Sequence, residues 1–284
     1  MQSIGNRRIH SFIDGHPNIT KVTNYQVRSK RGLSIGSFPA LVERVAELWF
    51  YNPEQMLLFR GQDKEYFSVR DNTSIKPSIF RPENGSKKSP PGPVVDNRYR
   101  KLKRAEKKVV DAYQGNHFLG YTRITRSRLL QWAIIQHYEV CDTPLLDVTH
   151  SLRVAASFAL SKDTATDPVV YVLAVPSLAG TITVCPDHEI QIVRLAGICP
   201  PNVARPHFQE GYLLGGYPDL TSYEEKQNYK PYEVDFGARL IAKFHLSRQL
   251  FSADTNYPPI PYAALYPDGR DELFPIAQQI KAEL

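Results

Sequence analysis

Apolar side chains along much of the chain recur every three or four residues, which is the spacing of amphipathic helices. Ser37 and Pro39 suit the first turn of one such helix, which continues to Trp49. The same spacing predicts helices at residues 39–49, 99–116 and 126–138, one that begins near Ser151, and a short one from about residue 273 to the end. The helix after Ser151 is rich in alanine, which implies close packing on a sheet.

Short apolar runs bounded by proline or glycine predict strands. Residues 169–175 form a β-branched run between two prolines, and residues 55–60 form a run that ends at Arg60. Further strands are expected at residues 181–184, 211–214 and 238–244. Because helices come early and most strands come late, the pattern predicts one α+β domain over residues 37–284.

Two segments fit this pattern poorly. Residues 1–36 combine basic residues and glycines with weak periodicity, so we expect a flexible, loosely attached N-terminal arm. Residues 84–97 are rich in proline, glycine, serine and lysine, which predicts a mobile surface loop.

The composition is that of a soluble globular protein, with 42% hydrophobic and 23% charged residues in a chain of 284. Lysine and arginine (35) outnumber aspartate and glutamate (29), and the formal net charge of +6 modestly favours an anionic partner. The chain has no apolar run of membrane-spanning length and no signal-like start, so we expect a cytoplasmic protein with no membrane partner. Cys141, Cys185 and Cys199 lie far apart, which disfavours a disulfide framework or a cysteine zinc site.

The first candidate for chemistry is the predicted strand end at Arg60. An arginine there, followed by Gly61 and Gln62, places a planar cationic group where a phosphate or pyrophosphate can approach the backbone. The alternative interpretation is a structural ion pair at the edge of the core.

The second candidate is the segment that leads into the alanine-rich helix. Thr149 and Ser151 lie two residues apart, so on an extended chain both hydroxyls would face one side, although Ser151 also fits a helix N-cap. His137 and Asp147 raise the alternative of a hydrolase or nuclease. They lack the spacing of a metal-ligand pair, so no metal is expected.

The third candidate is the turn before the strand at residues 211–214. Arg205, Gln209 and Glu210 precede Gly211 there, and a solvated turn is the plain alternative. Because Gln209 and Glu210 are adjacent, an extended chain points them to opposite faces, and only one can reach a cleft.

Residues 98–108 carry seven cations against a single acid, Glu106. These charges could follow the phosphates of a nucleic acid while Tyr99 and Tyr113 stack on bases, or they could form the solvated face of an ordinary helix.

Together, these motifs resemble the FRG-domain family from about residue 39 to the C-terminus. The resemblance is carried by Phe59 to Gln62, Gln136 to Tyr138, Leu145 to Thr149 with the alanines that follow, Arg205, Gln209 and Gly211, and the ending Leu265 to Asp268. The family usually has a glycine after the His-Tyr pair and Pro-Thr-Arg before Leu-Leu-Asp. Glu139 and residues 141–144 stand in those places here, so one arginine of the family pattern is absent.

The order of the motifs is also similar to that of the arginine-type ADP-ribosyltransferases. That resemblance implies an ADP-ribosyltransferase-like split β-sheet with an N-terminal helical part, and NAD bound in a cleft as the substrate. It implies nucleotide contacts for Arg60, Gly61, Gln62, His137, Tyr138, Asp147, Thr149, Ser151 and Arg205, and a catalytic role at the nicotinamide ribose for Gln209 or Glu210.

Cleavage of the bond to nicotinamide develops positive charge on the ribose, which a carboxylate stabilises better than an amide. In the transferase pattern the catalytic glutamate would fall at Gly211, and Glu189 is a further candidate nearby. If Glu210 or Glu189 faces Arg60, we expect an NAD-dependent mono-ADP-ribosyltransferase or NAD glycohydrolase, with a protein or nucleic-acid acceptor. Otherwise we expect a non-enzymatic module that binds a nucleotide or nucleic acid. The resemblance alone suggests a toxin or defence protein.

Overall fold

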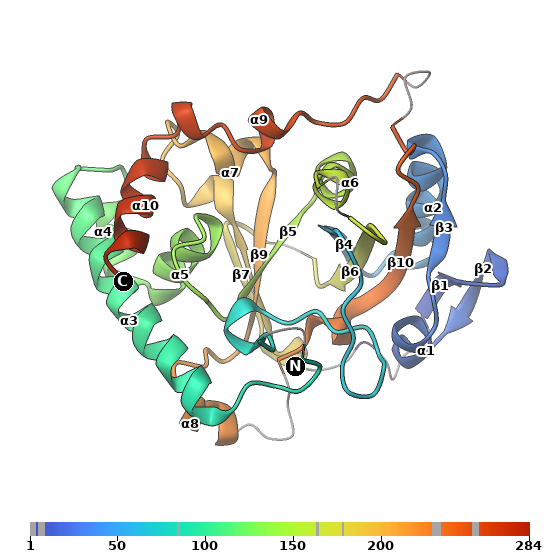
Figure 1. Cartoon of the computed structure of the whole chain (residues 1–284), viewed down its shortest axis with the longest axis horizontal. Coiled ribbons are helices and arrows are strands. Elements are labelled where there is room, and N and C mark those ends of the chain that lie inside the picture. The colour runs from blue at the N-terminus through green and yellow to red at the C-terminus, as the bar shows by residue number, and fades with distance from the viewer. Residues whose placement is uncertain are drawn as a thin grey trace.

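The computed structural model contains a large, mostly antiparallel β-sheet flanked by helices (Figure 1). It describes Ile4 and residues 9–83, 86–162, 165–177, 179–228, 234–251 and 256–284. Eight strands form the sheet in the order β3-β10-β6-β4-β5-β9-β8-β7, and β3 with β10 is its parallel pair. The strands are β3 Leu33–Ile35, β4 Met56–Gln62, β5 Leu145–Thr149, β6 Val169–Val175, β7 Ile182–Cys185, β8 Ile190–Arg194, β9 Gly211–Gly216 and β10 Leu240–Leu246. The predicted mixture of helices and sheet is confirmed.

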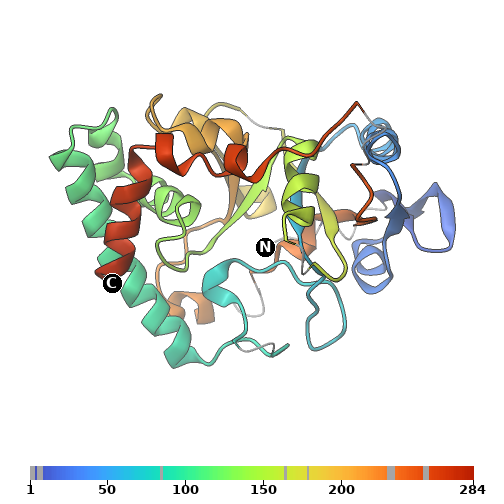
Figure 2. The same ribbon diagram turned by 45° about the horizontal axis from the view of Figure 1, so that its top comes forward.

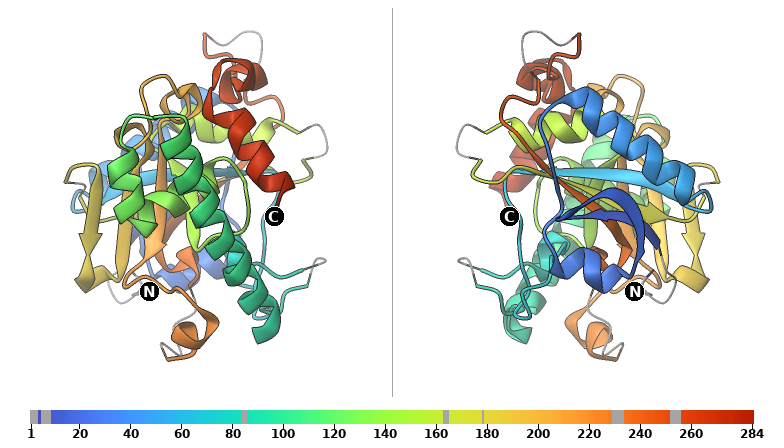
Figure 3. Two further views of the ribbon diagram at one scale, coloured as in Figure 1. Left: turned by 90° about the vertical axis from the view of Figure 1, so that its left-hand side faces the viewer. Right: turned by 90° about the vertical axis from the view of Figure 1, so that its right-hand side faces the viewer.

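Ten α-helices lie in the part of the chain that the structure describes. They are α1 Asn24–Ser29, α2 Phe38–Tyr51, α3 Gly92–Gly115, α4 Tyr121–Arg126, α5 Arg128–His137, α6 Leu152–Leu160, α7 Ala204–Phe208, α8 Tyr223–Asn228, α9 Tyr262–Leu265 and α10 Leu273–Ala282. Helices α3, α4, α5 and α10 pack together at one end of the sheet, and α1 and α2 lie at the other (Figure 1, Figure 3). None of the described helices has both the length and the apolar composition that a membrane span requires.

Hydroxyl side chains start three of the predicted helices. Ser37 accepts a hydrogen bond from the N–H of Ala40 at the start of α2, and Ser127 and Ser151 cap α5 and α6 in the same way. A side-chain oxygen at this position satisfies a backbone N–H that has no partner within the helix. The capping residues therefore explain why these helices begin where they do.

Residues 9–35 differ from the loosely attached arm that the sequence predicted, and only α1 among them fits the N-terminal helical part that the ADP-ribosyltransferase resemblance implied. Strands β1 (Ile9–Ile13) and β2 (His16–Val22) form a hairpin, and β3 joins the edge of the main sheet. The buried Asn24 amide donates to the carbonyls of Gly237 and Leu240. Strand β3 has three residues, too few to show a periodicity, and β2 is mostly polar, so the sequence did not reveal these strands.

The loop expected at residues 84–97 becomes helical in its second part. Helix α3 begins directly after Pro91, with a second proline in its first turn. Proline is favourable there because its φ is already helical and its missing N–H would have had no partner. Residues 84–85 of the loop, like residues 1–3 and 5–8 of the arm, lie outside the described residues.

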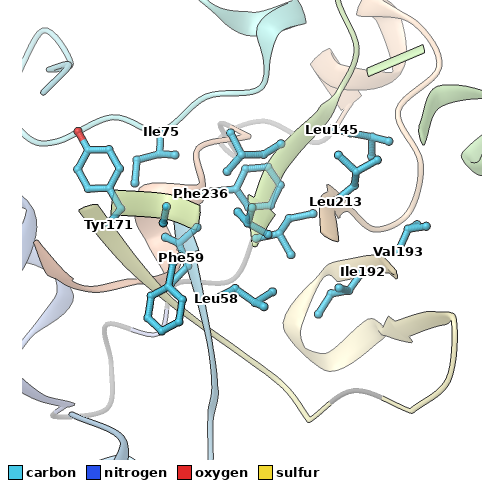
Figure 4. Packing of buried hydrophobic residues seen from close by; sticks show 14 of the residues in the cluster. Leu58, Phe59, Ile75, Leu145, Tyr171, Ile192, Val193, Leu213 and Phe236 are labelled. Carbon is cyan, nitrogen blue, oxygen red and sulfur yellow. The ribbon is translucent and has the colours of Figure 1, made fainter. Parts of the chain in front are cut away.

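The sheet is nearly divided between β4 and β5. Phe59 and Thr149 form the one matched pair between these two fully described strands, whereas β4 pairs with β6, and β5 with β9, along their whole lengths. Buried side chains from both halves, among them Leu58 and Leu213, still belong to one hydrophobic core (Figure 4). The strands therefore open away from each other while the core holds the two halves together.

Gly61 determines how closely α6 packs on β4. A Cβ atom at this position would lie 1.9 Å from the carbonyl oxygen of Ala155 and 2.8 Å from the backbone nitrogen of Ala159. These distances are too short for any side chain. The close packing on a sheet that the alanines of α6 predicted is present, and it requires glycine on the strand beneath.

We expect Gly61→Ala to lower the free energy of unfolding by about 1–3 kcal/mol, because the backbone of α6 has to move away from β4. Chemical denaturation measures this change. Gly36→Ala is the matched control, since its new Cβ would meet no atom within 4 Å. Equal stability of the two variants would contradict the close packing of α6 on β4.

Candidate functional site

A cavity of about 450 Å³ lies at the boundary where β4 and β5 separate. Helices α5 and α6 contribute to its wall, as does the connection between β4 and α3, which is cyan in Figure 2. Ligand sites for small molecules typically measure about 300–1,000 Å³, so the cavity is large enough for such a ligand. Its charged lining consists of Arg60, Lys76, Arg81, Lys87, Lys162 and Arg205, with Asp63, Glu139 and Asp147 as the carboxylates.

Most of the residues singled out in the sequence line this cavity. They are Arg60, Gly61, Gln62, His137, Asp147, Thr149, Arg205 and Gln209. These residues come from separate stretches of the chain, and the fold brings the three motifs to one place. Tyr138, Ser151 and Glu210 do not line the cavity.

The Arg60 guanidinium bridges the open boundary of the sheet. Its Nη1 donates to the backbone carbonyl of Asp147 over 2.5 Å, and its Nε is buried without a hydrogen-bond partner. Burial first, and then the nearby charge of Arg81, lower the pKa of Arg60 to about 10. The group is therefore charged at neutral pH and retains a donor for a ligand.

The Asp147 carboxyl is held in place on the cavity wall. Its Oδ2 accepts a hydrogen bond of 2.5 Å from Nε2 of Gln136, whose own Oε1 accepts one from the Thr143 hydroxyl. Burial raises the pKa of Asp147 above its usual range, and the neighbouring Arg60, Gln136 and Arg81 offset only part of that rise. A desolvated, oriented carboxyl in a cavity is typical of functional sites.

Arg205 forms a different part of the wall, together with aromatic rings. It is 4% exposed, and its guanidinium carbon lies 4.5 Å from the ring centroid of Tyr266 and 5.7 Å from that of Tyr138. Its Nη2 lies 3.6 Å from Oε1 of Glu139, whereas its Nε is buried without a hydrogen-bond partner. Arg205 is thus fixed by stacking and still has a donor to offer.

His137 is buried close to this arginine. Its Nε2 has no hydrogen-bond partner, although the residue is only 4% exposed. Burial first, and then the charge of Arg205, hold the pKa of His137 well below its usual range. The ring is therefore neutral at physiological pH, and its unpartnered nitrogen is suited to a hydrogen bond with a ligand.

Thr149 and Gln209 connect parts of the wall to each other. The Thr149 hydroxyl donates to the carbonyl of Gln209 over 2.8 Å and accepts from the N–H of Ser151 at 3.0 Å. Nε2 of Gln209 donates to the carbonyl of Leu265 over 2.7 Å. The groups that the resemblance implied for ligand contacts are thus engaged in bonds within the protein.

Tyr138 and Ser151 have structural roles outside the cavity. The fully buried Tyr138 hydroxyl donates to the carboxylate of Asp271, and the Ser151 side chain caps α6. The N-cap alternative for Ser151 is thus the one that the structure supports.

Neither glutamate that the sequence offered as a catalytic group lines the cavity. Glu210 is exposed and has a φ of 46°, and Glu189 has a φ of 50° in the turn between β7 and β8. Because Glu210 has a left-handed backbone, the alternation of an extended strand does not apply to it. Asp147 is the half-buried carboxyl beside Arg60 instead.

Several residues that line the cavity were not predicted from the sequence. Arg81 lies in a connection without a motif, and Tyr266 belongs to the family-like ending, to which no function was assigned. Gln136 adjoins His137 in its motif, but no local pattern indicated that its side chain would donate to Asp147. In each case the residue reaches the site only through tertiary packing.

No group of three or more histidine, cysteine, aspartate or glutamate side chains that could hold a metal ion occurs among the residues that the structure describes. The thiols of Cys141, Cys185 and Cys199 are free.

Residues 55–168 match the family model of the FRG domain. The match begins just before β4 and ends just before β6, so it includes Arg60, His137 and Asp147. Over these residues the match supports the resemblance to the FRG-domain family that the motifs indicated. A search of curated proteins and a search of solved structures found no match.

We expect Asp147→Asn to raise the melting temperature near neutral pH. The raised pKa means that ionised Asp147 is less favourable in the folded than in the unfolded protein, so wild-type stability falls as pH rises through that pKa. An amide avoids this loss. The difference from wild type should shrink towards about pH 4, where the carboxyl becomes protonated.

Thermal unfolding followed by fluorescence at both pH values checks this expectation. Asp187→Asn, which changes an exposed aspartate outside the cavity, is the control and should show little difference at either pH. A lower melting temperature for Asp147→Asn near neutral pH would mean that Asp147 stabilises the fold as an ion.

Proposed function

We propose that the cavity binds a nucleotide that contains a pyrophosphate, with NAD as the substrate, and that the protein cleaves the bond between nicotinamide and ribose. The activity would be that of an ADP-ribosyltransferase or NAD glycohydrolase. The observation that carries this proposal is the meeting of Arg60, Arg81 and Arg205 with one desolvated carboxyl, Asp147, in a single cavity.

The arginines favour a pyrophosphate. Arg60 and Arg81 lie close enough for the charge of one to lower the pKa of the other, and such repulsion is relieved when an anion binds between them. A planar guanidinium pairs with two phosphate oxygens at once. Lys162, by contrast, is already paired with Asp63 at 3.2 Å.

The aromatic part of the wall favours a ligand with flat rings. Tyr266 and Phe158 contact each other edge to face, with ring centroids 5.7 Å apart, and Tyr212 and Phe59 also line the cavity. Such rings stack on a nucleobase or on nicotinamide. NAD combines both ring systems with a pyrophosphate, so it matches the two kinds of wall.

Asp147 is our candidate for the catalytic carboxylate. The bond between C1′ of the ribose and the nicotinamide nitrogen breaks with its electron pair leaving on nicotinamide, and positive charge develops on the ribose. A carboxylate fixed near that charge lowers the energy of the transition state. Water or an acceptor nucleophile then attacks C1′ and loses its proton, which gives ADP-ribose or an ADP-ribosylated protein or nucleic acid.

The architecture of the sheet supports the same proposal. The order of the motifs implies an ADP-ribosyltransferase-like split sheet with NAD in the cleft, and the sheet here is nearly divided at β4 and β5, next to the cavity. The exposed position of Glu210 favours a second candidate, a module that binds the nucleotide without cleaving it.

We expect Arg60→Lys to weaken the binding of ADP-ribose by roughly tenfold or more, because a point charge does not replace a two-pronged contact. Isothermal titration calorimetry measures the affinity. Arg194→Lys, at an exposed position on β8 outside the cavity, is the matched control and should bind as wild type does. Unchanged affinity in Arg60→Lys would remove Arg60 from the site.

We expect Asp147→Asn to slow the release of nicotinamide from NAD by about 100-fold or more, while ADP-ribose still binds. Chromatography of the reaction mixture quantifies nicotinamide, and Asp187→Asn serves as the control. Activity that survives in Asp147→Asn but is lost in Glu210→Gln would assign the role to Glu210. Binding by the wild-type protein without release would favour the non-enzymatic module.

A further inference from the structure

A second charged feature lies along α3, with different residues from those of the cavity. A shallow groove there is lined by four cations, Arg100, Lys103, Arg104 and Lys107, and by one acid, Glu106. The cations all come from one helix and recur at spacings that place them along one side of it. They belong to the basic segment that the proposed function does not use.

The single acid of the groove is already paired within the protein. Oε1 of Glu106 accepts a hydrogen bond of 2.7 Å from Nε1 of Trp132, and its Oε2 lies 3.7 Å from Nε of Arg128. Arg128 is itself half-exposed, with a side-chain accessibility of 49%. The groove therefore keeps a clear excess of positive charge.

Two cations of the basic segment that lie outside the groove, Arg98 and Lys108, are engaged within the protein. Arg98 donates to the carbonyls of Ile79 and Arg81, and Lys108 pairs with Glu283, so these two fasten α3 to its neighbours.

Arg100, in contrast, pairs only with Asp96 of its own helix, at 3.3 Å, while 79% of its side chain is exposed. Such an exposed pair contributes little to stability, so Arg100 can exchange it for a phosphate.

The two tyrosines of α3, Tyr99 and Tyr113, do not line the groove. Tyr99 and Tyr113 are 6% and 2% exposed and belong to the hydrophobic core, so the alternative in which they stack on bases is wrong. Burial of these rings, together with other apolar side chains of α3, packs the helix on the protein. The groove therefore offers charge but no base-stacking platform from this helix, which favours contacts to a phosphate backbone over contacts to bases.

The four groove cations form a row along α3, and the length of this row matches the regular spacing of phosphates in a nucleic acid. From Arg100 to Lys107 the helix rises about 10 Å at 1.5 Å per residue. One strand of a DNA duplex carries a phosphate every 3.4 Å or so along its axis, so the row spans about three such intervals, which join four phosphates. A duplex presents these charges in a fixed line, whereas a single strand would first have to be ordered.

We propose that this groove on α3 binds the phosphate backbone of a DNA duplex without reading its sequence. The proposal does not rest on the nucleotide site, because no residue of the groove lines the cavity. Either proposal can fail while the other holds.

The test is the affinity of the full-length protein for a fluorescently labelled duplex of about 20 base pairs, measured by anisotropy over a series of salt concentrations. Four phosphate contacts predict a slope of about −3.6 for log affinity against log salt, which is roughly a 100-fold loss between about 50 and 200 mM. Two duplexes of unrelated sequence should give the same curve.

The combined variant Arg100→Gln, Lys103→Gln, Lys107→Gln should reduce the slope to about −1, because one groove cation remains. The combined control Lys21→Gln, Lys30→Gln, Arg194→Gln removes the same charge from exposed positions elsewhere and should keep the wild-type slope. Circular dichroism verifies that both proteins fold.

Three results would overturn the proposal. One is wild-type protein that shows no salt-dependent binding to the duplex, and another is equal weakening in the two combined variants, which would indicate net charge alone. The third is binding to phosphatidylserine vesicles with none to DNA, which would make the groove a membrane contact.

Discussion

The hydrogen bond from the Arg60 guanidinium to the carbonyl of Asp147 joins the two halves of the sheet where their strands otherwise share one matched pair. A cation in this position is partly desolvated, since burial lowers its pKa and its Nε has no partner. A fold that needed only a link between two strands would obtain it more cheaply from further backbone pairing. This cost favours the proposed role of Arg60 in ligand binding over a purely structural one.

Phe59, Arg60 and Gly61 are consecutive in β4, and each has a different structural role at the boundary with β5. Phe59 is buried and forms the matched pair with Thr149, Arg60 spans the gap that opens next to it, and Gly61 lets α6 pack against the strand. One residue joins the halves, the next supplies charge to the cavity between them, and the third brings a helix to its wall. The short motif thus combines pairing, charge and packing at one place.

Sequence periodicity predicted the elements that bury a long apolar face, such as β6 at Val169–Val175, and the motifs that line the cavity. It missed β3, which has three residues and is defined by its partner strand rather than by its own pattern. The sequence pattern also placed Gln209 and Glu210 on an extended chain, in which their side chains would point to opposite faces. Glu210 instead has a positive φ of 46°, so this alternation does not hold. Arg81 entered the site through a connection whose path depends on tertiary contacts alone. Local patterns therefore identified which motifs meet, but not which carboxylate faces the arginine.

The proposed function requires that a pyrophosphate binds at the boundary between β4 and β5, and a crystal structure of the protein with ADP-ribose would show where it lies. We expect the pyrophosphate within hydrogen-bonding distance of Arg60 and Arg81, with C1′ of the terminal ribose directed towards Asp147. Clear density for ADP-ribose at another place on the protein, or in the cavity with its pyrophosphate away from Arg60, would contradict the proposed function.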